Sequence, residues 1–139
     1  MTHMVIKKYI LVCFILNICY GQNWIQNQRI ERQFKEAVSS YNSGRYATSE
    51  AMLNKMIDLP YKSFNEKSLL LLLKSQVALN KSDDAKQTAK AFFSEYPSSS
   101  FLNHAMESIG DLFVNNSNYE SAYRMYVRSK NLSDSNTYQ

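Results

Sequence analysis

The stretch Ala91–Phe113, AFFSEYPSSSFLNHAMESIGDLF, contains the end of one predicted helix and the start of another. Apolar residues at helical spacing stop at Tyr96. Pro97 cannot continue the helix, and its ring forces Tyr96 out of helical geometry. Three serines follow, one of which can cap a new helix, and the apolar pattern restarts at Phe101. This break between two similar patterns predicts a joint between helical units.

The rest of the chain after residue 27 has the same alternation of apolar helical patterns and short turns. No strand-like alternation of useful length occurs in it. Turn residues stand at Asn42–Gly44, Asn80–Ser82 and Asn115–Asn118, and the two prolines are Pro60 and Pro97. The pattern predicts an all-α fold whose six helices cover about 28–41, 46–58, 66–79, 84–95, 101–113 and 119–130.

The six predicted helices form three pairs with matching small residues. Ser49, Ala85 and Ala122 stand at the same place in the second helix of each pair, 36 and 37 positions apart. Small side chains there let the two helices of a pair approach closely, and Gly110 has the same role on the fifth helix. We expect Tyr46 or Tyr119, which precede these residues, to wedge against the partner helix.

The turn within each pair calls for a residue that tolerates a left-handed backbone. Gly44 and Asn80 occupy this place in the first two pairs, and glycine and asparagine adopt that conformation at the lowest cost. Ser117 stands there in the third pair and is a weaker choice, so Asn116 and Asn118 are the alternatives.

With three such helix pairs, the chain resembles the tetratricopeptide repeat (TPR) family, whose unit of about 34 residues is a pair of antiparallel helices. The best match is Ile109–Phe113 (IGDLF) with Asn118–Tyr123 (NYESAY) and Tyr126; the first two repeats match more loosely. The resemblance implies a right-handed superhelical stack of about three antiparallel helix pairs. Its repeats would cover about 28–60, 64–97 and 101–132.

The phrase Phe93–Ser100 (FSEYPSSS) is similar to the joint in a bacterial envelope subgroup of this family. That subgroup includes the outer-membrane β-barrel assembly TPR lipoprotein, the Tol-Pal cell-division coordinator and the N-terminal part of penicillin-binding-protein activators. The resemblance implies a protein-protein interaction module or scaffold whose partners belong to envelope-assembly or peptidoglycan machinery. The alternative is the N-terminal helical regulatory part of a longer chain with a ligand-binding or enzymatic domain.

In this family the first helix of each pair forms most of the concave inner face. The positions carried over to this chain are aromatic in the first repeat, basic in the second and acidic in the third, a gradient suited to an extended peptide of mixed charge. The candidate partner-binding residues are Phe34, Tyr41, Asn42, Lys67, Lys74, His104, Glu107, Asp111 and Asn115. For Phe34 and Tyr41, packing between repeats is an equal alternative, as it is for the neighbouring Leu70 and Val77.

The first 21 residues have the layout of a secretory signal peptide. Lys7 and Lys8 precede an apolar run of 12 residues, Tyr9–Tyr20, and Cys19 and Gly21 are small residues before the expected cleavage site. A membrane-spanning helix needs about 20 residues, so we expect cleavage, a TPR-like domain over 22–139, and export to the periplasm or the periplasmic face of the outer membrane. A retained anchor and a lipid on Cys19 are alternatives, and the lipid would add membrane attachment.

The chain expected after cleavage offers few groups for catalysis. It has one histidine, His104, no cysteine, no glycine-rich phosphate loop and no nucleophile elbow. His104 and Asp111 share a helix face, which hints at a paired site, but we interpret this face as a solvated surface. We therefore expect no enzyme activity, no cofactor and no metal.

The charge of the expected mature chain is small. Removal of Lys7 and Lys8 leaves 14 basic and 12 acidic residues, a net charge of +2. So weak a positive charge, spread along the chain, predicts no nucleic-acid partner.

The sixth predicted helix carries more apolar surface than one neighbouring helix covers. Tyr119, Tyr123, Tyr126 and Val127 all lie on it. This surplus predicts self-association through the last helix, a further partner, or a continuation of the chain.

Overall fold

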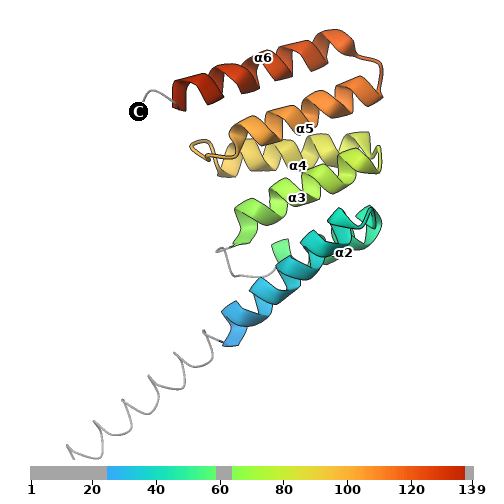
Figure 1. The fold of residues 1–139 in the computed structure, drawn as a ribbon, viewed down its shortest axis with the longest axis vertical. Helices are drawn as coiled ribbons and strands as arrows, with labels where there is room; N and C mark the ends of the chain where they lie inside the picture. The colour runs from blue at the N-terminus through green and yellow to red at the C-terminus, as the bar shows by residue number, and fades with distance from the viewer. Residues whose placement is uncertain (1–24, 59–63, 137–139) are drawn as a thin grey trace, which may run out of the picture. The chain divides into compact units, whose positions relative to one another are not determined.

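The computed structural model describes residues 25–58 and 64–136, with side chains to residue 133. Within these ranges the chain forms six helices and no strand, so the predicted all-α fold is confirmed. The first helix covers residues 25–42, and the others are α2 (Tyr46–Ile57), α3 (Asn65–Ala78), α4 (Ser82–Glu95), α5 (Leu102–Asn115) and α6 (Tyr119–Asn136) (Figure 1). The expected signal peptide at 1–21 and the proline at position 60 lie outside the described residues.

The chain divides into two compact units, Met1–Arg32 and Gln33–Gln139, and the boundary falls within the helix at 25–42. The described residues of the first unit, 25–32, are helical throughout. The second unit holds the end of that helix together with α2 to α6.

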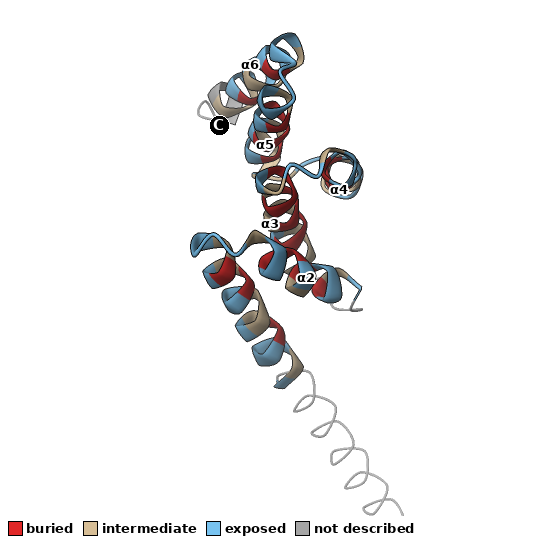
Figure 2. Ribbon diagram, turned by 90° about the vertical axis from the view of Figure 1, so that its right-hand side faces the viewer, coloured by how far each residue is buried: buried red, intermediate tan, exposed pale blue. Residues whose placement is uncertain are grey.

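The helices of the second unit pack in the order of the chain. Helix α3 contacts α2 and α4, and α5 contacts α3, α4 and α6; α3 lies between α2 and α5 (Figure 1). Helix α4, seen end-on in Figure 2, lies to one side of α3 and α5. Thus α5 packs against its own partner α6 and against both helices of the preceding pair, as in a stack of helix pairs.

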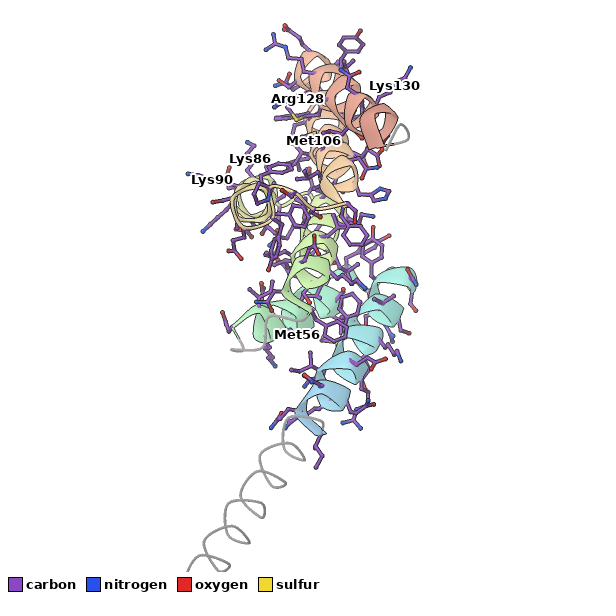
Figure 3. All side chains as sticks on the ribbon, turned by 90° about the vertical axis from the view of Figure 1, so that its left-hand side faces the viewer. Met56, Lys86, Lys90, Met106, Arg128 and Lys130 are labelled. Carbon is purple, nitrogen blue, oxygen red and sulfur yellow. The ribbon has the colours of Figure 1, made fainter. Side chains whose placement is uncertain are left out.

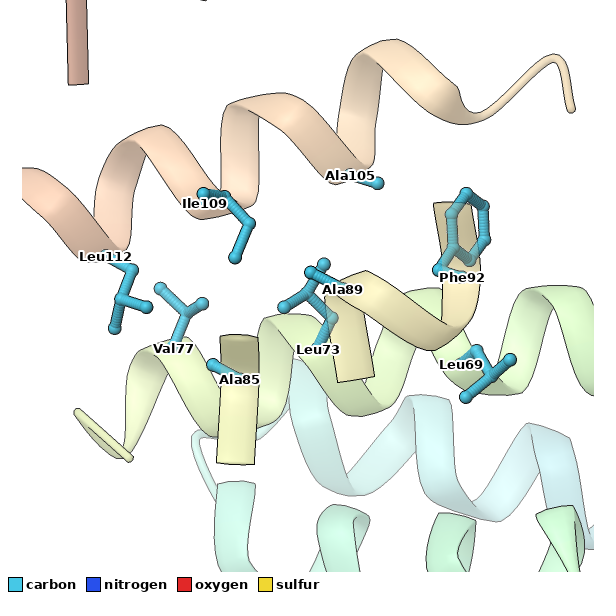
Figure 4. Packing of buried hydrophobic residues seen from close by; sticks show 9 residues of the cluster. All are labelled: Leu69, Leu73, Val77, Ala85, Ala89, Phe92, Ala105, Ile109 and Leu112. Carbon is cyan, nitrogen blue, oxygen red and sulfur yellow. The ribbon is translucent and has the colours of Figure 1, made fainter. Parts of the chain in front are cut away.

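The core of the second unit lies where three of these helices meet. Phe92, Leu73 and Leu112 are fully buried there. The leucine-rich segment of α3 is covered on several sides, because α2, α4 and α5 all contact this helix. The buried cluster consists of Leu69, Leu73, Val77, Ala85, Ala89, Phe92, Ala105, Ile109 and Leu112 (Figure 4).

The turns within the three pairs share one hydrogen-bonded form. Gly44 and Asn80 have positive φ angles of 74° and 55°, as predicted, and Ser117 itself adopts 58° in the third turn. In each turn the next residue's backbone N–H donates to the carbonyl five residues earlier, as Lys81 does to Gln76 at 2.9 Å. This arrangement ends the first helix and satisfies one of its last carbonyl groups.

The predicted close approach of paired helices occurs between α5 and α6. Ala122 is 2% exposed, and the ring of Tyr126 lies against the backbone of Gly110. In the first pair, Tyr46 packs edge-on against Tyr41 with ring centroids 5.2 Å apart. The corresponding prediction for Tyr119 is wrong: its side chain is 67% exposed, and Tyr126 takes the wedge position instead.

The joint between α4 and α5 lies where the break at Tyr96 and Pro97 predicts it. Helix α4 ends at Glu95, and the Ser99 hydroxyl accepts a hydrogen bond from the backbone N–H of Phe101 at 2.9 Å. Helix α5 begins one residue later, and Phe101, which occupies its N-cap position, makes no side-chain cap. A serine therefore shapes the turn before the helix without capping the helix itself.

The predicted end of the last helix at residue 130 is wrong, because α6 continues to Asn136. Ser129 donates a hydrogen bond to the Asn103 carbonyl at 3.1 Å, and the amide of Asn103 donates to Ser133 at 3.2 Å. These bonds to α5 hold the last turns of α6 in place despite their weak helix formers.

Candidate peptide-binding face

One side of the second unit is lined by the first helices of the three pairs. Two neighbouring hollows open on it, which together define what we call the groove face. Their lining residues recur every three or four positions along each helix, the spacing that places side chains on one side. They are Phe34, Val38 and Tyr41 from the helix at 25–42, Lys67, Leu70, Leu71, Lys74, Val77 and Ala78 from α3, Phe101, and His104, Glu107, Ser108, Asp111 and Asn115 from α5.

The first hollow is apolar and has a volume of about 330 Å³. Phe34 and Val38 line one side, Leu70 and Leu71 belong to α3, and Phe101 stands just before α5. All five are half-buried. A hollow of this kind fits an apolar side chain.

The second hollow is polar and has a volume of about 370 Å³. Tyr41 contributes to it from the first helix, and His104, Glu107 and Asp111 contribute from α5. Lys74 lines both hollows and therefore stands where the apolar part of the face meets the polar part.

Hydrogen bonds fix the carboxylates of the polar hollow. The hydroxyl of Tyr126 donates to Asp111 at 2.6 Å; the Ser129 hydroxyl lies 3.0 Å from Glu107 and shares its single proton between this carboxylate and the Asn103 carbonyl. The Nδ1 atom of His104 lies 3.2 Å from the other oxygen of Glu107. Helix α6 thus holds both acidic groups by hydrogen bonds from its own side chains.

The lysines of the face are in a different situation. Neither Lys67 nor Lys74 forms an ion pair with any residue in the described ranges. The side chain of Lys74 is half-buried, whereas Lys67 is exposed. Their positive charges are therefore available to an anionic group placed over the junction of the two hollows.

The tyrosines near the polar hollow stay protonated at neutral pH. Burial, together with the hydrogen bond to Asp111, raises the pKa of Tyr126 to about 12. Burial also raises the pKa of Tyr41, and the charges of Tyr46 and Asp111 act in the same direction. Both groups therefore remain neutral phenols beside the carboxylates.

The structure brings together eight of the nine candidate residues. Tyr41, Lys74, His104, Glu107, Asp111 and Asn115 line the polar hollow, and Phe34, Lys67 and again Lys74 line the apolar one. Asn42 is exposed and lines neither hollow. Leu71, Ser108 and Phe101 were not among the expected positions; Leu71 lies four residues after Lys67 and Ser108 four after His104, so helical spacing pointed to both.

The described residues contain no group of three or more histidine, cysteine, aspartate or glutamate side chains that could hold a metal ion. Over the same part of the chain, no helix combines the length and apolarity needed to cross a membrane. Comparison with protein-family models, curated proteins and solved structures finds no match to this chain.

The exposed surface of α6 differs from that of α4. Tyr119, Tyr123 and Val127, four residues apart, are 67%, 70% and 38% exposed, whereas the aligned positions in α4 include Lys86 and Lys90, which project outward (Figure 3). Self-association through α6 stays a prediction. A change at Tyr123 tests it, because Tyr123 is exposed whereas Tyr126 packs within the chain.

Proposed function

We propose that this protein is a non-catalytic TPR-type module of the bacterial cell envelope that binds a protein partner through the groove face. In this proposal the chain is exported to the periplasm or the outer membrane, and its helix pairs form a right-handed superhelical stack. The observation that carries the proposal is the convergence of the first helices on two adjoining hollows that share Lys74.

The chemistry of the face favours an extended peptide segment of mixed character. An apolar side chain of that segment fills the hollow beside Phe34 and Leu70, and an acidic side chain nearby pairs with Lys74. A basic or hydrogen-bond-donating side chain then meets Glu107 and Asp111, whose oxygens are held in place by α6. This order of side chains gives the partner both register and direction on the face.

Selection of peptides from a random display library with the purified chain tests the proposal. We expect the selected peptides to share an apolar residue followed at short range by an acidic one. Lys74→Glu should weaken their binding about tenfold or more, because it replaces attraction by repulsion at a partly desolvated site.

Lys90→Glu is the matched control, since Lys90 is an exposed lysine on α4 that lines neither hollow (Figure 3). It makes the same change in net charge and should leave binding unaltered. Equal loss in both variants, or selection of peptides with no common pattern, would refute a specific groove.

A further inference from the structure

Helix α6 has a free side that the groove face does not use. Among α2 to α6, this helix contacts α5 alone. Tyr119, Tyr123 and Val127 lie on its free side, and their four-residue spacing places them in one strip along the helix. We call these three residues the tyrosine strip. The two hollows of the groove face include no residue of α6, so the strip is a separate surface.

Stacking of helix pairs does not account for the tyrosine strip. When the second helices of the pairs are aligned on their small residues, Tyr123 and Val127 correspond to Lys86 and Lys90 in α4. Both lysines are exposed, although α5 packs beside α4. A further helix pair stacked on α6 in the same way would therefore leave Tyr123 and Val127 exposed. The strip is an outward surface that has become apolar where α4 carries charge.

Three exposed cations accompany the strip, namely Arg124, Arg128 and Lys130. Arg124 forms an ion pair with Glu120 one turn earlier. Arg128 and Lys130 form no ion pair with any described residue. At about 100° per residue they lie on opposite edges of the free side, and they project to the two sides of α6 in Figure 3. The strip is therefore flanked by two unpaired positive charges.

The helix dipole does not account for these cations either. Basic residues stabilise a helix in its last turn, where they interact with the negative end of the macrodipole, and the effect fades within that turn. Helix α6 continues to Asn136 and has no basic residue in its last turn. Arg128 and Lys130 therefore have neither an ion pair in the described structure nor a favourable place at the helix end, and both are available to an external anion.

Exposed tyrosines beside unpaired cations suit an anionic lipid surface. The tyrosine side chain joins an apolar ring to a polar hydroxyl, and it is enriched where membranes meet water. Lysine and arginine lay their apolar stems along such a surface while the charge reaches the headgroups. A second copy of the chain offers less, because Glu120 is the one acidic residue among 119–133 and already pairs with Arg124.

We propose that the free side of α6 is a membrane-contact surface that lies on anionic lipid headgroups. The tyrosine strip enters the interface between headgroups and water, and Arg128 and Lys130 pair with lipid phosphates on its two sides. The helix lies along the membrane surface, since no described helix has the length and apolarity to cross a bilayer. This contact uses no residue of the two hollows and does not depend on the function proposed for the groove face.

Co-sedimentation with lipid vesicles tests the proposal. The expected mature chain, residues 22–139, contains every described helix and lacks the apolar run Tyr9–Tyr20, which could itself bind lipid. We expect this chain to bind vesicles of phosphatidylglycerol and phosphatidylethanolamine at least about tenfold more tightly than vesicles of phosphatidylcholine, which carry no net charge. High salt should remove most of this preference, because it screens the attraction between exposed charges.

Two double variants separate the ionic from the apolar contribution. Arg128→Gln with Lys130→Gln should weaken binding to the anionic vesicles about tenfold or more, since each cation near such a surface contributes about a factor of five. Tyr123→Gln with Val127→Gln should also weaken it about tenfold, because it removes most of the apolar surface that enters the interface. All four side chains are exposed, so we expect melting temperatures near that of the unmodified chain.

Lys86→Gln with Lys90→Gln is the matched control. It removes the same charge from exposed positions of α4, a helix that does not contact α6. Binding to the anionic vesicles should change less than about twofold, because charges away from the contact are screened at physiological salt.

Several results would overturn the proposal. They are absence of vesicle binding at the highest soluble protein concentration, equal binding to both kinds of vesicle, and unaltered binding in both α6 variants. An equal loss in the α4 control would show attraction by net charge alone and would also overturn it. Sedimentation of the unmodified chain as a dimer that Tyr123→Gln dissociates would assign the strip to a second copy instead.

Discussion

At the residue scale, Tyr126 contributes both to the packing of α6 against α5 and to the groove face. Its ring lies against Gly110, where an added methyl group would be 2.5 Å from Cε1. Its hydroxyl donates to Asp111, one of the carboxylates that line the polar hollow. The absence of a side chain at position 110 therefore lets the Tyr126 ring lie where its hydroxyl reaches Asp111, the next residue of α5.

Gly110→Ala should destabilise the protein, although alanine is the better helix former. The new methyl group displaces the Tyr126 ring, and such overpacking costs about 1–3 kcal/mol. In a Tyr126→Ala background the same change should instead stabilise by up to about 1 kcal/mol, because only helix propensity remains. Urea denaturation of the four proteins measures both values, and the absence of this reversal of sign would contradict the close contact.

Tyr126 should also make stability depend on pH in alkaline solution. Its pKa is raised from 10.0 to about 12 in the folded chain, first by burial and then by the bond to Asp111. Below pH 10 the phenol is neutral in both the folded and unfolded states, and its contribution is complete. Between pH 10 and 12 the unfolded state releases the proton more readily, so stability falls as the pH rises.

Tyr126→Phe removes this titration and the hydrogen bond together. At neutral pH we expect a loss of about 1 kcal/mol, and the gap to the unmodified protein should narrow from pH 10 to 12. Thermal unfolding at several pH values measures the difference in stability between the two proteins. Both contain the other tyrosines, so the titration of those residues cancels in the difference. A gap that stays constant over this range would show that the Tyr126 pKa is not raised.

At the element scale, the three turns within pairs are equivalent in backbone form but not in sequence. Gly44 and Asn80 suit their positive φ angles, whereas Ser117 adopts 58° with a side chain that disfavours it. The third turn thus stores backbone strain that the first two avoid.

Ser117→Gly should therefore stabilise the protein, by about 0.5–1 kcal/mol. The control is Ser43→Gly, in the first turn, where φ is not positive. That change should destabilise slightly, because glycine adds entropy to the unfolded chain. Chemical denaturation compares the two, and stabilisation by both variants or by neither would contradict the strain at Ser117.

The elements also show which features the sequence could predict. Local chemistry predicted the left-handed residues at Gly44 and Asn80 and the joint at Pro97, because each depends on one residue's own backbone preference. The wedge at Tyr126 in place of Tyr119 and the extension of α6 to Asn136 depend on contacts between α5 and α6. Residues far apart in the chain make those contacts, so local patterns could not reveal them.

The sequence likewise predicted only part of the groove face: helical spacing predicted which residues share a side, but not the contacts that those residues make. Helical spacing placed residues such as Lys74 and Asp111 on one side of their helices, and the structure brings those sides together. Spacing could not show that side chains of α6 already hydrogen-bond Asp111 and Glu107, whereas Lys74 forms no ion pair with any described residue. Asn42 fails to join the hollows because it is the last helical residue before the turn and is exposed there.

At the scale of the whole molecule, α3 is the helix on which the groove face depends most, because it contributes to both hollows. One side of it carries Lys67 and Lys74 toward the groove face. The same helix is covered by α2, α4 and α5.

The central claim is that Lys74 receives an acidic side chain of a bound peptide segment on the groove face. The most direct measurement is a charge exchange, in which Lys74→Glu is paired with a selected peptide whose acidic residue is replaced by lysine. We expect each single change to weaken binding about tenfold and the two together to restore most of the affinity, as for a direct charge pair. Failure of the double exchange to recover affinity, while both proteins remain folded, would contradict the proposed contact.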